Sequence, residues 1–91
     1  MAADLLFPHL IRTTAQARAA FPAFLETVEQ SIDHVQELPR SMLGLEHWNT
    51  AFLALWAATD FPADAARLAL AGTALCTALA AEGWLDELPA S

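Results

Sequence analysis

The side chains that could carry chemistry are few in this chain of 91 residues. Its histidines are His9, His34 and His47, and none has a Glu three residues earlier, so the paired Glu-x-x-His motif of di-iron bundles is absent. His34 and Glu37 would share one helical turn, but one such pair is a weak ligand set. Glu46 directly precedes His47, so these two side chains would point in different directions. The sequence therefore predicts no metal and no cofactor.

The single cysteine, Cys76, has no His or Arg within one helical turn of sequence. A nucleophilic thiol needs such a neighbour to favour the thiolate, so we interpret Cys76 as an inert residue of a buried helix. The three glycines are isolated, which excludes a glycine-rich phosphate loop. We expect that the protein is not an enzyme, and we keep a small helical enzyme as an alternative.

Acidic residues dominate the charge, because eleven Asp and Glu stand against four Arg and no Lys, for a formal net charge of −7. Such a balance argues against direct nucleic-acid binding. Four of the acids repeat at spacings of three, four and four and would share one helix face: Glu26, Glu29, Asp33 and Glu37. This face is either a solvated helix back or a surface that attracts Lys and Arg of a partner, so the four are candidate partner-binding residues.

Prolines divide the chain into helical segments. Three Phe-Pro pairs, at 7–8, 21–22 and 61–62, place Pro where a helix can begin, with Asp60 as an N-cap of the last helix. Pro39 and Gly83 would end two of the helices. Apolar residues recur every three or four positions, most clearly after residue 20. The sequence predicts a single all-α domain, a small four-helix bundle with helices over about 8–20, 22–37, 42–58 and 62–82 and a short C-terminal tail.

The third predicted helix begins with Ser41-Met42-Leu43-Gly44-Leu45-Glu46. This stretch is similar to the start of the second helix in acyl and peptidyl carrier proteins, which are acidic four-helix domains of this length. The resemblance covers six residues and implies phosphopantetheine attached to Ser41. Arg40 stands where that family has Asp, so we interpret Ser41 as a helix N-cap and keep a carrier protein as an alternative.

Some apolar side chains lie outside the predicted core stripes. Leu53 and Trp56 fall about 100° around the third helix from its main stripe. Trp84, Leu85 and Leu88 follow Gly83 in a tail too short to bury itself, with Asp86 and Glu87 beside them. The fourth helix also has a second face of small residues, Ala69, Thr73, Cys76 and Ala80. We expect one contact patch built from Leu53, Trp56, Trp84, Leu85 and Leu88, rimmed by acids.

These features predict a small acidic helical protein-binding module, which acts on a larger protein as an inhibitor, chaperone or assembly factor, or self-associates as a homodimer. The first residues lack a basic stretch, and the apolar run over 68–81 is 14 residues long, short of the roughly 20 that a bilayer needs. We therefore expect a cytoplasmic protein that does not enter a membrane. The use of Ala and of Arg with no Lys indicates a bacterial or phage source. We expect a regulatory protein.

Overall fold

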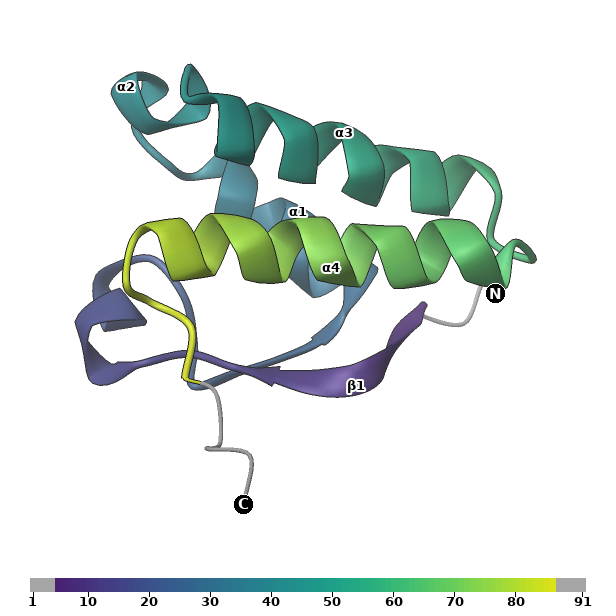
Figure 1. Cartoon of the computed structure of the whole chain (residues 1–91), viewed down its shortest axis with the longest axis horizontal. Helices are drawn as coiled ribbons and strands as arrows, with labels where there is room; N and C mark the ends of the chain where they lie inside the picture. Colours follow the sequence, from purple (N-terminus) through teal and green to yellow (C-terminus); the bar gives the residue numbers. More distant parts are fainter. Residues whose placement is uncertain (1–4, 87–91) are drawn as a thin grey trace.

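The computed structural model describes residues 5–86. The elements in chain order are β1 (Leu6–Arg12), the 3-10 turn η1 (Ala15–Ala19), β2 (Phe24–Thr27), α1 (Val28–Gln36), α2 (Arg40–Leu43), α3 (Glu46–Asp60) and α4 (Ala65–Ala81). β1 and β2 pair antiparallel, and the long helices α3 and α4 lie side by side on one side of the strands (Figure 1). The fold is mixed α and β, so the predicted all-α four-helix bundle is wrong.

The first 27 residues of the chain account for the error. Residues predicted as a helix over 8–20 form β1 and η1, and the start of the predicted helix over 22–37 forms β2. Ile11 and Thr13 are both buried, which is the period-two alternation of a strand. Ala17 and Phe21 are spaced as in a helix. The 3-10 turn explains this spacing, because Phe21 follows directly after its C-cap and the N–H of Phe21 donates to the carbonyl of Ala17 over 2.8 Å.

Pro8 lies inside β1 instead of starting a helix. The register passes from Leu6 opposite Thr27 to Ile11 opposite Leu25, so the β1 strand carries extra residues between these pairs. Such an irregularity tolerates a proline, which has no N–H to give to a ladder. A two-strand sheet of this kind is marginal alone, and packing against α1 and α4 stabilises it.

The helices begin and end at residues other than those predicted. Thr27 is the N-cap of α1, and its Oγ1 accepts a hydrogen bond from the N–H of Gln30 over 3.0 Å. Asp60 is the last residue of α3, not the N-cap of α4. Ser41 lies within the short helix α2, and Leu45 is the N-cap of α3.

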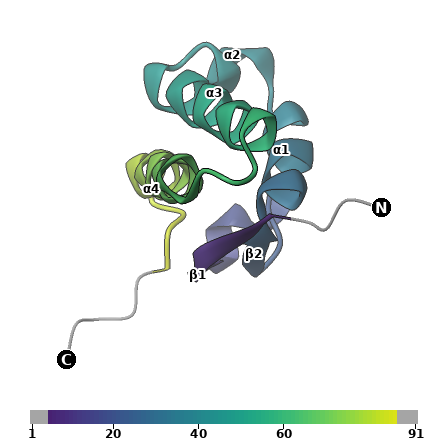
Figure 2. The ribbon, with the colours of Figure 1, turned by 90° about the vertical axis from the view of Figure 1, so that its right-hand side faces the viewer.

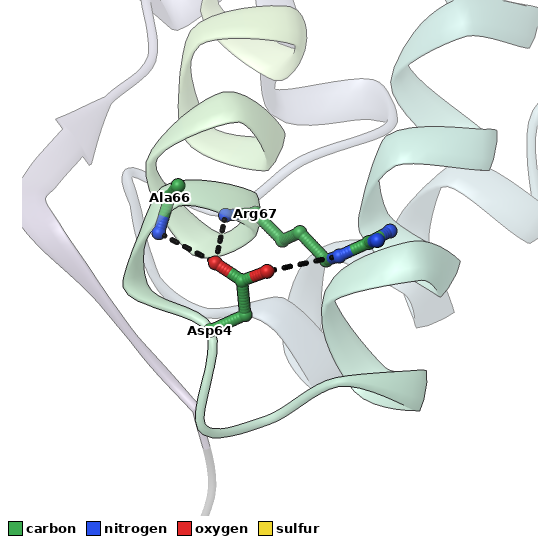
Figure 3. Close-up of polar contacts among 3 residues, drawn as sticks. All are labelled: Asp64, Ala66 and Arg67. Carbon is green, nitrogen blue, oxygen red and sulfur yellow. Dashed lines mark hydrogen bonds and ion pairs between the residues drawn. The ribbon is translucent and has the colours of Figure 1, made fainter.

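Asp64 is the N-cap of α4. Its Oδ1 accepts from the N–H groups of Ala66 (3.0 Å) and Arg67 (3.2 Å), and its Oδ2 accepts from Nε of Arg67 over 3.0 Å (Figure 3). The backbone hydrogen bond from Arg67 is the largest cause that holds the pKa of Asp64 below its usual value. The Arg67 guanidinium also lies 4.1 Å from the centre of the Phe61 ring, which joins the α3–α4 turn to the first turn of α4.

An aromatic cluster lies between the start of α3 and the end of α4. Trp48 is fully buried and stacks on Phe21 with ring centres 5.7 Å apart, and the Trp84 ring is 6.1 Å from each of them. The indole N–H of Trp48 donates to Oε2 of Glu82 over 3.1 Å. His47 Nε2 lies 2.9 Å from the same oxygen. The hydrogen bonds from His47 and then Trp48 lower the pKa of Glu82, and they join α3 to α4.

Close packing between α4 and β1 depends on Gly72. A Cβ atom at this position would lie 3.3 Å from Cδ1 of Phe7, so glycine allows the strand to approach the helix. Viewed along the helix pair, α4 lies beside β1, and α1 lies on the β2 side (Figure 2). This arrangement places the predicted small-residue face of α4 next to β1.

Candidate functional site

The outer side of α3 carries two of the predicted partner-binding residues. Leu53 is 60% exposed and Trp56 is 44% exposed. The core-facing residues of α3 are Trp48, Ala51, Leu55 and Ala58. At about 100° per residue, the opposite side presents five exposed residues within one stripe: Glu46, Asn49, Leu53, Trp56 and Asp60. We call this stripe the α3 outer face.

The Trp56 indole is held in place on this face. Its ring meets the half-buried Phe52 ring edge-on, with centres 6.1 Å apart and planes at 84°. With 44% of its surface exposed, Trp56 is therefore a surface residue and not part of the core. A positioned, exposed indole with an acidic residue at each end of the stripe is a surface feature that the fold alone does not require.

The tail residues do not join this face. Trp84 is half-buried in the aromatic cluster on the inner side of α3, and Leu85 is half-buried and pairs with Thr13 beside β1. Leu88 and Glu87 lie outside the described residues. The structure thus brings Leu53 and Trp56 together, and it places Trp84 and Leu85 elsewhere.

The predicted acidic helix face is divided between two elements. Glu26 lies on β2 and is exposed, whereas Glu29 lies in the first turn of α1, where its Oε1 accepts from the N–H of Leu5 over 3.0 Å. Asp33 is exposed on α1, and Glu37 is the exposed C-cap of that helix. Three of the four acids keep their common helical spacing, and Glu26 is separated from them because its segment is a strand.

The histidines do not gather into a metal centre. Among residues 5–86 there is no group of three or more His, Cys, Asp or Glu side chains that could hold a metal ion. His34 Nδ1 lies 3.1 Å from the carbonyl oxygen of Ala20, and His47 is bonded to Glu82. His9 is exposed on β1. Within the same residues, the helices are all too short or too polar to cross a bilayer.

A second surface was not predicted. A groove of about 510 Å³ runs between β1 and α4. Its walls come from five consecutive residues of β1, from Leu85 and from one side of α4: Phe7, Pro8, His9, Leu10, Ile11, Ala69, Gly72, Thr73, Cys76, Thr77, Ala80 and Leu85. We call it the β1–α4 groove. The small residues of α4 were recognisable in the sequence. The opposite wall of the groove is β1, most of which was predicted to be part of a helix.

Comparisons with known proteins do not assign this chain to a family. No family model matches it, and neither the curated proteins nor the solved structures include a significant match.

Proposed function

We propose that this protein is a small acidic protein-binding module that docks through the α3 outer face onto a larger protein. The partner surface is an apolar groove with Lys or Arg at its rim. The observation that carries the proposal is the exposed pair Leu53 and Trp56, with Glu46 and Asp60 on the same stripe. Helix-in-groove recognition uses apolar anchors at such spacings.

Charge supports this choice of partner. The helix α3 contains no Lys or Arg, and the whole chain carries a net charge of −7. A basic rim would attract this surface before contact and fix its orientation. Trp is among the residues most enriched where binding energy concentrates, because its large rigid ring brings much contact area at low entropic cost.

The same charges disfavour a homodimer through this face. Two copies would bring Glu46 and Asp60 of each chain toward the same acidic residues of the other, without a cation from either α3. A larger protein with complementary charge meets no such repulsion. An inhibitor, a chaperone and an assembly factor all use a surface of this kind.

The carrier alternative receives less support. It implied a four-helix domain, and the N-terminal segment forms strands. Ser41 is exposed in the second position of α2, which is four residues long. We therefore do not propose phosphopantetheine attachment.

Site-specific photo-crosslinking tests the proposal. A photoreactive residue at position 53 in the producing cell should form one major crosslinked product, and mass spectrometry then identifies the partner and the crosslinked residues. The matched control places the same photoreactive residue at position 70, because Leu70 is 61% exposed on α4 and lies outside the α3 outer face. The proposal requires position 53 to crosslink to an apolar site with basic neighbours. Equal products from both positions, or contacts only with copies of this chain, would contradict it.

A further inference from the structure

The outer edge of β1 is occupied at its C-terminal end. The N–H of Thr14 donates to the carbonyl of Trp84, and the carbonyl of Arg12 accepts from the N–H of Asp86, each over 2.9 Å. The backbone N–H of Thr13 faces the opposite edge of the strand, and it donates to the carbonyl of Ala23 over 3.0 Å. The Trp84–Asp86 segment therefore starts a third strand, antiparallel to β1 at Thr13 and Leu85.

The same alternation directs Leu10 toward the groove. Ile11 pairs with Leu25 of β2, and the trans peptide directs the Leu10 carbonyl opposite to the Ile11 N–H, so this carbonyl faces away from β2 as that of Arg12 does. Leu10 is 53% exposed and lines the β1–α4 groove. Pro8, two residues earlier, has no N–H to offer. The Leu10 carbonyl thus presents an acceptor at an edge that continues an existing strand pairing.

The groove lies beside β1, where a further strand of the sheet would lie. The α4 wall consists mainly of Ala, Gly and Thr with Cys76, so a chain can approach the helix closely. Among the described residues, 5–86, no Asp or Glu lines the groove, and residues 5–25 contain none at all, although the chain as a whole is strongly acidic. We propose that the β1–α4 groove binds an extended, uncharged apolar segment of another polypeptide, which adds to β1 as a strand.

A second copy of this chain is a poorer occupant. Pairing two β1 strands edge to edge would bring the second α4 close to the first, since α4 lies beside β1 (Figure 2). Neighbouring strands are about 4.8 Å apart, whereas packed helices need about 8–10 Å between axes. A single extended segment that brings no helix of its own avoids this collision. The groove is distinct from the α3 outer face, so this binding goes beyond the proposed function.

A labelled peptide tests strand addition. The probe is acetyl-Thr-Val-Thr-Val-Thr-Val-Thr-amide with a fluorophore, because its valines can face α4 while its threonines face solvent. The matched control peptide has the same side chains and N-methyl groups on its central amides, which removes the donors. We expect the probe to bind the full chain at least tenfold more tightly than the control, because the control lacks donors for the Leu10 carbonyl. Absence of binding, or equal binding of the two peptides, would overturn the proposal.

Two variants locate the binding. Thr73→Phe adds a ring inside the groove, and it should weaken probe binding at least tenfold, because Thr73 lines the groove and is exposed. Leu70→Phe adds a ring to the same helix outside the groove and should change binding less than twofold. Equal effects of both variants would place the peptide elsewhere. Probe binding that occurs only in a chain ending at Asp86 would assign the groove to residues 87–91 of this chain, and it would overturn the proposal.

Discussion

Trp48 and Glu82 are 34 positions apart in sequence and are joined by a hydrogen bond of 3.1 Å from the buried indole N–H to Oε2. The same oxygen lies 2.9 Å from Nε2 of His47. One carboxylate therefore fixes the start of α3 against the end of α4. The register of α3 on α4 depends on this contact, and so does the side of α3 that is left facing solvent.

Removing the Glu82 carboxylate should destabilise the fold. Glu82→Ala leaves the buried Trp48 N–H without its acceptor, and we expect a loss of about 1–3 kcal/mol in the free energy of unfolding. Glu82 is the C-cap of α4, where the helix dipole disfavours a negative charge by about 0.3–1 kcal/mol. Removing the charge relieves this repulsion, but the loss of the hydrogen bonds is larger. Glu82→Gln keeps a neutral acceptor and should lose less. Urea unfolding of the three proteins gives the order, and a Glu82→Ala variant as stable as the parent would contradict it.

Acid should weaken the same contact. The pKa of Glu82 is lowered in the folded chain from its usual 4.5, so the folded state binds this proton less readily than the unfolded state does. The resulting stabilisation is fully present above about pH 4.5, and it is lost as the pH falls through the lowered pKa of Glu82 in the folded state. Asp64 contributes in the same direction, because its pKa is lowered too. Unfolding measured from pH 7 to pH 3 should show a smaller decline for Glu82→Gln than for the parent, and parallel curves would argue against the role of Glu82.

The Thr27 cap marks the boundary between strand and helix. Thr27 is the last residue of β2 and the N-cap of α1, where its Oγ1 accepts from the N–H of Gln30. Thr27→Ala should cost about 1 kcal/mol, whereas Thr27→Ser, which keeps the hydroxyl, should cost less. Thermal unfolding with circular dichroism checks both variants. If the two substitutions have equal effects, the hydroxyl does not stabilise the start of α1.

The apolar periodicity of the sequence predicted which residues are buried better than it predicted their secondary structure. Phe21, Leu25, Val28, Ile32 and Val35 recur every three or four positions, the spacing that predicted helices after residue 20, and all five are buried. Only the last three lie in α1, because β2 continues directly into that helix, and Leu25 faces the same core from a strand. A four-residue strand is too short to show a period of two clearly, and β1 carries an irregularity that interrupts its alternation.

The long helices were easier to predict than the surfaces they form. The segments over 42–58 and 62–82 contain most of α3 and all of α4, since their patterns extend over many turns. The exposure of Leu53 and Trp56 agrees with their position outside the main apolar stripe. The β1–α4 groove could not be predicted, because it depends on β1 being a strand and on its packing against α4, which is far from it in sequence.

The Trp56→Glu variant decides whether the α3 outer face binds, once crosslinking has identified the partner. We expect its Kd for that partner to rise at least 30-fold, which corresponds to the roughly 2 kcal/mol of an anchor residue, while its urea unfolding changes by less than about 1 kcal/mol. Leu70→Glu, an exposed apolar site on α4, serves as the control and should leave the Kd within threefold. A Trp56→Glu protein that stays folded and binds the partner as tightly as the parent would contradict the proposed function.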